Sequence, residues 1–516
     1  MSLSLQSAAR ELFAENLLHE IITPHMWTMN AASVENNEVP FTAITYDTRT
    51  VTPGSLLVCK GNFNPKYLEQ ANKLGMAAYV ATNDYSAYTD APWLIVSDDK
   101  KALSILAQAY YDHPERQLTL IGITGTKGKT TTAYYTHAII NALSGNTTAL
   151  FSSVDNCVDG MHYVESDLTT PESLDAVRMM REAVNNGMKY LVMEVSSQAY
   201  KVNRVYDFHF DVAAFLNISP DHISPIEHPS FENYLWCKRQ IIRNADMLVL
   251  GERSDHEQLL LEDAELNRVP VSTFALADSP AQSDIADVTC APTNMEHTAF
   301  DYFVDGERLG SLTLAMEGDF NYANAAAALA IAHDIGMDVS DPRALASLAD
   351  VRISGRMEEM HDSRSNTLAI VDYAHNFASV NALLDFVEQR YGAEHPHITL
   401  ITGSAGNKAY DRREGIVKAA QDRVQKLILT AEDTDTEPIE QICSEMANNV
   451  TNEDLDVQTI LDRAEAVKHA VDEARAADGG LSILLLIGKG DEQWIKDRNI
   501  HTPYEGDSQI IRRLFA

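Results

Sequence analysis

The segment "GTKGKTTT" at residues 125–132 combines two glycines with two lysines and four threonines. It follows the apolar run 118–123 and precedes a helix-like pattern. A glycine-rich turn between a strand and a helix exposes backbone N–H groups, and the start of the helix adds positive potential, so phosphate oxygens bind there. Lys129 would reach the terminal phosphates of a nucleotide, and the Thr130 hydroxyl would bind magnesium.

We therefore predict an ATP site, formed by Gly125, Thr126, Lys127, Gly128, Lys129, Thr130 and Thr131. The strict phosphate-loop pattern has glycine where this chain has Ile123, which leaves a tight surface turn as the alternative. A nucleotide loop alone does not separate a ligase from a kinase or a switch protein.

Three further side chains could act beside this loop. Glu194 ends the strand-like run "YLVMEV", and His222 follows "NISPD" at the end of another predicted strand. Carboxyl ends of parallel strands meet at one edge of a sheet, where a carboxylate can bind magnesium. The alternatives are a buried acid paired with a strand-end N–H for Glu194 and a structural histidine for His222. Lys238, in "FENYLWCKRQ", is by itself a snorkelling lysine.

The elements that must position these residues fall into three predicted blocks. Short strand-like and helix-like runs fill residues 1–114, and His113-Pro114 marks a plausible boundary. In residues 115–350, apolar strands alternate with helices, which predicts a central doubly wound, mostly parallel sheet of the phosphate-loop type. The same alternation in residues 351–516 predicts a Rossmann-like domain. The fold class is therefore α/β with three domains.

Composition narrows the function further. The 516 residues carry 75 acidic and 40 basic side chains, a formal charge of −35, which disfavours nucleic acid and anionic lipid as partners. Five scattered cysteines without CxxC spacing indicate a reducing cytosol. No signal peptide or long apolar span is present, so we expect a soluble cytoplasmic protein without membrane contact, and a monomer.

The sequence also resembles the Mur ligase family, which builds the peptide of the bacterial cell-wall precursor. "GITGTKGKTTT" is similar to the ATP loop of that family, whose GT-x-GK-[ST] variant accounts for Ile123. Resemblance to the tripeptide synthetase branch runs from about residue 45 to 493 through "YDTRTVTPGSLLVCKG", "LTTPE", "MEVSSQA", "NISPDHISPIEHPSFENYLWCKRQ", "GRME", "DYAHN" and "GKGDEQ". It implies that Glu194 and His222 bind magnesium and that Lys238 is carbamylated by CO₂, which yields an anion able to hold metal.

The resemblance implies further ligand contacts. A sugar nucleotide with a pyrophosphate and carboxylates would meet hydroxyls and one guanidinium, from Thr48, Thr169, Thr170, Ser196 and Arg204. ATP would additionally meet Asn321, Asn324, Arg356 and His375. Without the resemblance, Thr48 is interpreted as an ordinary turn residue. The pair Thr169-Thr170 and the asparagines Asn321 and Asn324 are then interpreted as helix starts.

The amino acid to be added is indicated by "TAEDTDTEP". Diaminopimelate-adding relatives have a D-N-P-R motif whose arginine grips the distal carboxylate, and the matching residues here are Glu432, Asp433, Thr434 and Asp435. An acid in place of that arginine favours the ε-ammonium of lysine. Lysine enzymes usually have a proline where this chain has Thr434, so ornithine stays open, and a solvated acidic loop is the structural alternative. Arg413 would hold the incoming α-carboxylate, with Gly488 and Glu492 beside the amino group.

The predicted reaction has two steps. ATP phosphorylates the D-glutamate γ-carboxylate of UDP-N-acetylmuramoyl-L-Ala-D-Glu, while magnesium and Lys129 neutralise charge; the amine of the diamino acid then displaces phosphate. Three alternative functions remain. The chain could be the same type of ligase adding diaminopimelate, a folylpolyglutamate-type ligase, or a nucleotide-dependent binding or regulatory protein without catalysis.

Overall fold

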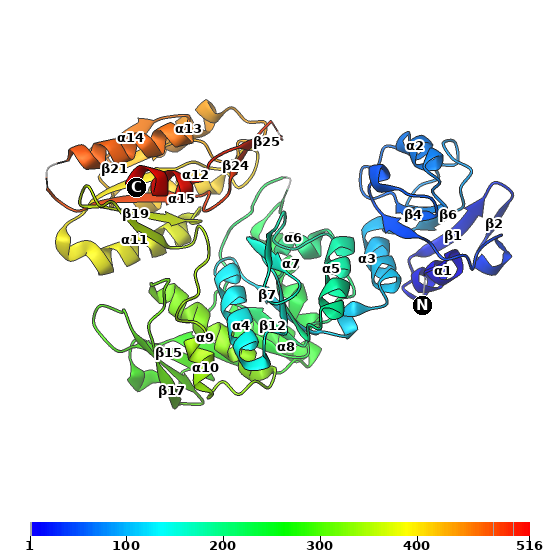
Figure 1. Cartoon of the computed structure of the whole chain (residues 1–516), viewed down its shortest axis with the longest axis horizontal. Helices are drawn as coiled ribbons and strands as arrows, with labels where there is room; N and C mark the ends of the chain where they lie inside the picture. Colours follow the sequence, from blue (N-terminus) through cyan, green and yellow to red (C-terminus); the bar gives the residue numbers. More distant parts are fainter. Residues whose placement is uncertain (1–2, 226, 478, 499) are drawn as a thin grey trace.

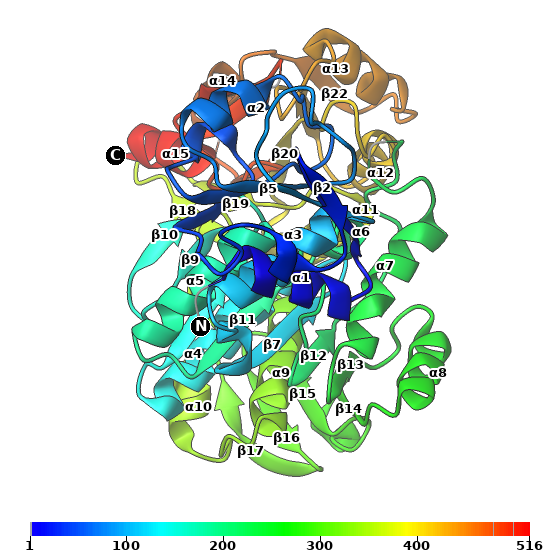
Figure 2. The same ribbon diagram turned by 90° about the vertical axis from the view of Figure 1, so that its right-hand side faces the viewer.

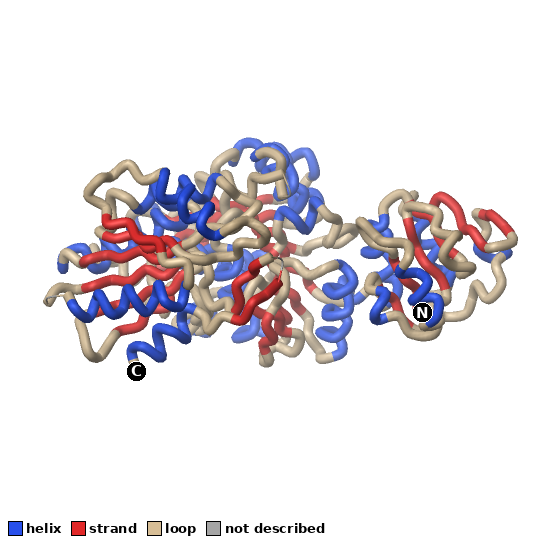
Figure 3. Tube along the Cα trace, turned by 90° about the horizontal axis from the view of Figure 1, so that it is seen from above, coloured by secondary structure: helices blue, strands red, loops and turns tan. Residues whose placement is uncertain are grey.

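The computed structural model describes residues 3–225, 227–477, 479–498 and 500–516. It contains three large sheets, and we call the parts that carry them the N-terminal unit (strands within 18–96), the central unit (119–312) and the C-terminal unit (358–487). Figures 1 and 3 show an elongated molecule with the N-terminal unit at one end and the central unit between the other two. The mixed α/β class is confirmed, while the domain boundaries at 114 and 350 stay predictions.

The N-terminal sheet is parallel except at β1, which pairs antiparallel with both of its neighbours. Its spatial order is β2 (Met26–Thr28), β1 (Leu18–Thr23), β6 (Trp93–Val96), β5 (Ala78–Ala81), β4 (Ser55–Val58) and β3 (Ala43–Thr45). Its helices are α1 (Leu5–Ala14), α2 (Tyr67–Lys73) and α3 (Asp99–Tyr110). Helix α3 leads toward the central unit (Figure 1).

The central sheet is parallel in its middle and antiparallel at both edges. The order is β10 (Tyr163–Glu165), β9 (Asp155–Cys157), β8 (Thr148–Phe151), β11 (Tyr190–Glu194), β7 (Thr119–Thr124), β12 (Val212–Phe215), β13 (Leu248–Gly251), β14 (Val271–Leu276), β15 (Val288–Pro292), β16 (Phe300–Val304) and β17 (Glu307–Leu312). Figure 2 looks along the molecule from the N-terminal unit and shows β11, β7, β12 and β13 side by side. The phosphate-loop strand β7 therefore lies between β11, which ends at Glu194, and β12, which leads to His222.

Helices cover both faces of this sheet, as a doubly wound fold requires. Its helices are α4 (Lys129–Ser144), α5 (Ser173–Asn185), α6 (Ser197–Lys201), α7 (Phe231–Arg243), α8 (Glu257–Asn267), α9 (Asp319–Asp334) and α10 (Pro342–Ala346). Side chains of β7 alternate between the two faces: Ile121 and Ile123 join the core under α4 and α9, and Leu120 joins the opposite core. Helix α9, predicted from its alanine run, has Ala325–Ala328 fully buried, because small side chains let it pack closely on α4 and the sheet.

The C-terminal sheet is parallel apart from its first strand. Its order is β18 (Glu358–His361), β19 (Thr367–Asp372), β23 (Ser482–Ile487), β20 (His397–Thr402), β21 (Lys426–Leu429) and β22 (Asp456–Thr459). The hairpin β24 (Trp494–Asp497) and β25 (Ile500–Pro503) follows, with helices α11 (Phe377–Tyr391), α12 (Asp411–Ala420), α13 (Ile439–Asn448), α14 (Arg463–Ala476) and α15 (Asp507–Phe515). No helix in the described ranges is both long and apolar enough to cross a membrane.

Candidate active site

The phosphate loop turns between β7 and α4 on two glycines with positive φ. Gly125 has φ 156° and Gly128, the N-cap of α4, has φ 83°. A side chain on Gly128 would also collide with the Asn324 amide on α9, so both backbone conformation and space require glycine there. The first bond of the helix runs from Thr132 N–H to Gly128 O at 2.9 Å, so the preceding N–H groups point out of the helix start, as an anion site needs.

A cavity of about 720 Å³ opens over this loop. Its walls come from the central unit and from the start of the C-terminal unit. Among the residues predicted from the sequence, it is lined by Thr126, Lys127, Gly128, Lys129, Thr130, Thr131, Thr169, Glu194, His222, Asn321, Asn324, Arg356 and His375. Gly125, Thr48, Thr170, Ser196, Arg204, Lys238, Arg413, Glu432, Asp433, Asp435, Gly488 and Glu492 are not part of its lining.

Glu194 is fully buried at the end of β11. Its carboxylate accepts hydrogen bonds from Ser153 N–H at 2.7 Å and from the Ser153 hydroxyl at 3.2 Å. The same hydroxyl lies 3.0 Å from the Thr169 hydroxyl, and Thr170 donates to Glu194 O at 2.9 Å. The two threonines predicted for the sugar nucleotide are thus tied to the strand that carries the acid beside the phosphate loop.

His222 follows β12 in a left-handed conformation, φ 58°, which is strained for a residue other than glycine. Its Nδ1 lies 2.9 Å from a Glu227 oxygen, so Nε2 is the nitrogen left for a ligand. A carboxylate that fixes the far ring nitrogen is typical of metal-binding histidines. The described residues contain no group of three or more histidine, cysteine and acidic side chains that would by itself hold a metal ion.

Lys238 lies on α7 with 2% of its surface exposed. Its amine donates to Gly125 O at 2.8 Å and stands 5.0 Å from the ring centre of Tyr234. Burial, helped by the nearby Lys129 cation, places the pKa of Lys238 far below its ordinary value.

Lys129 folds back over its own loop, with Nζ 3.0 Å from Gly125 O, and burial lowers the pKa of Lys129 as well.

Lys127 turns away from the loop toward the C-terminal unit. Its Nζ lies 3.0 Å from His375 Nε2 and 3.3 Å from an Asp221 oxygen. Burial lowers the pKa of Lys127 to about 8, although the Asp221 charge opposes this shift. Burial also depresses the pKa of His375 strongly, with help from the cations Arg412 and Lys127. The histidine is therefore neutral near neutral pH.

Three other predicted nucleotide contacts come from helix α9 and from the segment before β18. The Arg356 guanidinium stacks over the Tyr373 ring, with its carbon 4.3 Å from the ring centre. The Asn321 side chain donates to Glu317 O at 3.1 Å, and Asn324 lies against Gly128. All three line the same cavity as Glu194.

Two of the acidic side chains in the stretch after β21 already form ion pairs with lysines. Asp433 pairs with Lys489 at 2.9 Å, and Asp435 pairs with Lys496 on hairpin β24–β25 at 2.8 Å. Glu432 is 8% exposed, and its Oε2 atom is buried without a hydrogen-bond partner among the described residues. Burial and the adjacent Asp433 raise its pKa. The Glu432 carboxylate is therefore the unpaired acid of this stretch.

The other residues predicted for the amino acid are engaged with protein groups. Glu492 pairs with Lys489 and accepts from the Tyr373 hydroxyl at 3.0 Å, which links it to the cavity wall. Arg413 is buried and bonded to Glu437 at 2.7 Å and to Glu445. An incoming carboxylate would have to share Arg413 with these two acids, so its predicted role stays a prediction.

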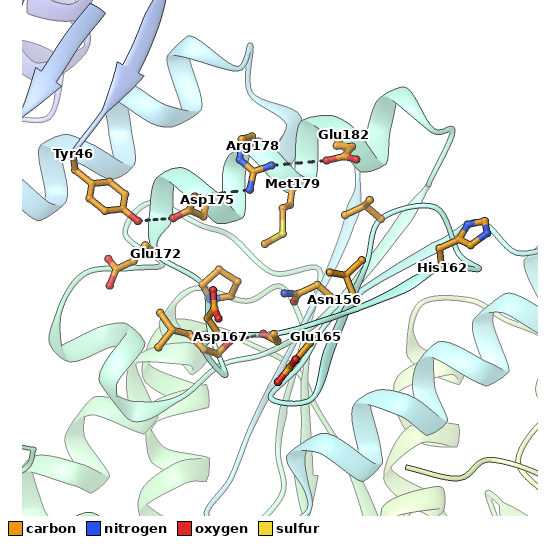
Figure 4. Close-up of a pocket in the computed structure, with 15 residues that line it drawn as sticks. Tyr46, Asn156, His162, Glu165, Asp167, Glu172, Asp175, Arg178, Met179 and Glu182 are labelled. Atoms are coloured by element: carbon orange, nitrogen blue, oxygen red, sulfur yellow. Dashed lines mark hydrogen bonds and ion pairs between the residues drawn. The ribbon is translucent and has the colours of Figure 1, made fainter. Parts of the chain in front are cut away.

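A second cavity, of about 560 Å³, lies between helix α5 and the segment that carries β9 and β10, and Tyr46 of the N-terminal unit also lines it (Figure 4). The Tyr46 hydroxyl donates to Asp175 at 2.6 Å. Glu172, which also lines this cavity, pairs with Arg204 at 3.0 Å and with Lys60 at 2.6 Å. These contacts join the two units where the sugar-nucleotide residues were predicted. Ser196 caps α6, and Thr48 begins a short 3₁₀ turn.

Sequence reasoning missed several residues around the main cavity. Asp221 lies between Lys127 and the Arg412 guanidinium, and the Tyr234 hydroxyl donates to Thr126 at 3.1 Å. Tyr373 supports Arg356 and Glu492. All four stand inside or beside stretches singled out from the sequence, and the visible signal for Asp221 was an acid directly before His222.

Comparison with known proteins agrees with this geometry. Residues 123–332 match the Mur ligase middle domain, and residues 355–490 match the Mur ligase glutamate ligase domain. The chain is 59% identical to the UDP-N-acetylmuramyl-tripeptide synthetase of Bifidobacterium longum, with all of both chains covered. It is 40% identical to the UDP-N-acetylmuramoyl-L-alanyl-D-glutamate--L-lysine ligase of Enterococcus faecalis, with 98% of each chain covered.

A solved structure of a UDP-N-acetylmuramoyl-L-alanyl-D-glutamate--2,6-diaminopimelate ligase superposes with a TM-score of 0.63. The alignment covers 100% of this chain and 99% of the other at 20% identity, which supports the α/β fold with three sheet-bearing units. The cavity, the two matched domains and the full-length relatives agree, and this chain belongs to the Mur ligase family.

Proposed function

We propose that the chain is an ATP-dependent ligase that joins L-lysine to the D-glutamate γ-carboxylate of UDP-N-acetylmuramoyl-L-alanyl-D-glutamate. The observation that carries this proposal is the cavity in which the phosphate loop and Glu194 face Arg356 and His375 of the C-terminal unit. The name of the Enterococcus faecalis relative supports lysine as the added amino acid. The proposal assigns ATP to residues 115–350, the UDP-sugar to 1–114 and the amino acid to 351–516.

ATP would bind with its phosphates over the loop 125–131. The N–H groups at the start of α4 and the Lys129 ammonium would receive the terminal phosphates, and Arg356 lines the same cavity. Transfer of the terminal phosphoryl group to the γ-carboxylate gives an acyl phosphate and ADP. The amine of lysine then attacks the carbonyl carbon, phosphate leaves, and an amide remains.

Magnesium fits the donors that face the cavity. Glu194 offers carboxylate oxygens, Thr130 a hydroxyl, and His222 its Nε2, and oxygen-rich sets of this kind suit Mg²⁺. Because these side chains alone do not enclose an ion, phosphate oxygens would complete the set. When bound, magnesium supplies positive charge that offsets the negative charge of the phosphates.

The surroundings of Lys238 favour carbamylation of its side-chain amine. Only a neutral amine adds to CO₂, and burial, which lowers the pKa of Lys238 well below its ordinary value, favours the neutral form. The carbamate would carry negative charge among Lys129, the loop and the His222 side of the cavity. The carbamate nitrogen would keep one hydrogen with which to donate to Gly125 O, the amine's present partner.

Lysine would place its distal ammonium against Glu432. This carboxylate is the unpaired acid of the stretch, whereas Asp433 and Asp435 already have lysine partners. Burial of a carboxylate without a partner costs desolvation free energy that nothing offsets. An ion pair with the ammonium of the substrate would offset that cost. A distal carboxylate on the substrate would instead be repelled, which disfavours diaminopimelate.

The remaining proposals concern location and assembly. We place the enzyme in the cytoplasm as a monomer. All five cysteines are buried and free of disulfide bonds, in keeping with a reducing compartment.

The test is ADP release by the purified chain with ATP, magnesium and the UDP-linked dipeptide. Lysine, ornithine and meso-diaminopimelate are supplied in separate arms, and one arm has no amino acid. We expect steady ADP release with lysine and little without it. A binding protein would release no ADP in any arm, and a preference for diaminopimelate would contradict the assignment of the acceptor.

A further inference from the structure

Asp221 is the meeting point of the central and C-terminal units. It is 1% exposed. One carboxylate oxygen accepts from Arg412 Nη2 at 2.8 Å and from Arg412 Nε at 3.0 Å. The other accepts from the Asn376 side chain at 3.0 Å and from Lys127 Nζ at 3.3 Å, and His375 Nε2 lies 3.7 Å away.

These partners come from both sides of the boundary between the units. Lys127 is in the phosphate loop, and Asp221 is in the loop after β12. His375 and Asn376 follow β19, with Asn376 as the N-cap of α11, and Arg412 is in the first turn of α12. One buried carboxylate therefore joins the nucleotide loop to the starts of two helices of the C-terminal unit, α11 and α12.

The same carboxylate is also connected to His222. The His222 N–H donates to Asp221 Oδ1 at 2.9 Å, and His222 is held in a left-handed backbone conformation. Such a conformation persists where surrounding contacts over-determine it. The two hydrogen bonds from Arg412 to Oδ1 therefore also hold the turn that places the His222 imidazole at the cavity.

An isolated buried carboxylate would be unfavourable in the low-dielectric interior. Separation of the units would remove Arg412, Asn376 and His375 from Asp221 and leave Lys127 and the His222 N–H of the central unit beside it. The arrangement of Lys127 and His222 is therefore expected to depend on whether the C-terminal unit is docked.

We propose that Asp221 is a positioning residue that couples docking of the C-terminal unit, through Arg412, to the placement of Lys127 and His222 beside the nucleotide. This inference rests on the proposed ligase function. It goes beyond it by assigning the coupling to one carboxylate that does not line the cavity and to one arginine that the sequence did not single out.

The test is a double-mutant cycle in the full-length chain with Asp221→Asn and Arg412→Gln, assayed for ligation with ATP, dipeptide and lysine. We expect each single change to lower kcat by about 100-fold, the scale of a misplaced catalytic group. The double variant should lose little more than either single variant. Arg412→Lys keeps one positive charge and should recover part of the activity.

Arg513→Gln is the matched control, since it breaks an exposed pair with Glu505 inside the C-terminal unit. It should leave kcat and KM unchanged. Multiplicative losses in the double variant, or wild-type kcat and KM in Asp221→Asn, would overturn the proposal. A lower Tm with unchanged kinetics well below Tm would also overturn it, because that pattern describes a merely stabilising ion pair.

Small-angle X-ray scattering separates failure of this inference from failure of the proposed function. With a non-hydrolysable ATP analogue, wild type and Arg513→Gln should be compact, and Asp221→Asn and Arg412→Gln should show a larger radius of gyration. This readout needs no turnover. Compaction of all four chains alike would overturn the coupling even if ligation were confirmed, and absence of ligation in wild type would refute only the proposed function.

Discussion

Gly488 and Glu432 are packed so closely that a Cβ atom on Gly488 would stand 2.6 Å from the Glu432 Oε2 atom. Gly488 also has φ +99°, a conformation that other residues rarely adopt. The glycine directly after β23 therefore provides the space in which the unpaired carboxylate lies. Specificity for the amino acid depends on this contact if Glu432 receives the distal ammonium.

Gly488→Ala should displace Glu432 and weaken binding of the amino acid. We expect KM for lysine to rise by roughly 10-fold or more, because small displacements of positioning groups are costly. KM for ATP should be unchanged. Gly306→Ala is the control, since Gly306 has φ +75° and open space around its Cβ position. That variant should lose about 1–2 kcal/mol of stability from backbone strain and keep its KM for lysine.

Glu432→Gln should raise KM for lysine by roughly 10- to 100-fold, the range for a hydrogen bond to a charged group. Since the pKa of Glu432 is raised by burial and Asp433, the charged form is lost earlier on acidification than for an ordinary glutamate. KM in the wild type should therefore increase as pH falls, and this increase should be smaller in Glu432→Gln. Asp435→Asn is the matched comparison and should raise KM for lysine less than Glu432→Gln does, because Lys496 already pairs with Asp435. Equal effects of both changes would argue against Glu432 as the main contact.

Lys129→Ala should lower kcat by about 100- to 1,000-fold, as expected for removal of one charge-stabilising donor. Its ammonium is positioned over the loop by Gly125 O and Thr126 O. Circular dichroism should show an intact fold. A variant with near-normal ADP release would contradict the role given to this lysine.

Stability should depend on His137, a buried residue of α4 whose Nε2 lies 3.0 Å from Thr148 O. Burial lowers the pKa of His137 to about 4 from an ordinary value of 6.5. The unfolded chain therefore binds a proton that the folded chain does not, so this group lowers the free energy of unfolding as pH falls from 6.5 to 4. The full effect is about 3 kcal/mol. Denaturant unfolding of His137→Gln should lack this contribution, whereas the exposed His361→Gln should retain it.

Much of the fold could be predicted from local pattern. The strand before the phosphate loop and the alanine-rich helix α9 carry strong signals, because apolar runs and helix propensity act over neighbouring residues. Part of the cavity wall could also be predicted, since Glu194 ends β11 and His222 lies in the loop after β12, and both strands flank β7. Their ligand roles remain predictions.

The contacts between units could not be predicted in this way. Asp221 and Arg412 are 191 residues apart, and no local periodicity reports such a pair. The sequence drew attention to Arg413, yet consecutive residues on a helix point in different directions. Arg412 turns to Asp221, and Arg413 turns to Glu437. The pairing of Asp435 with Lys496 likewise depends on a hairpin whose position the sequence did not indicate.

The most direct test of the account follows the oxygen atoms of the substrate carboxylate. Dipeptide substrate labelled with ¹⁸O in the glutamate γ-carboxylate is incubated with the enzyme, ATP, magnesium and lysine, and the released phosphate is analysed by mass spectrometry. Phosphoryl transfer to the carboxylate predicts one ¹⁸O atom in each phosphate released. Phosphate without label, formed while amide product accumulates, would contradict it.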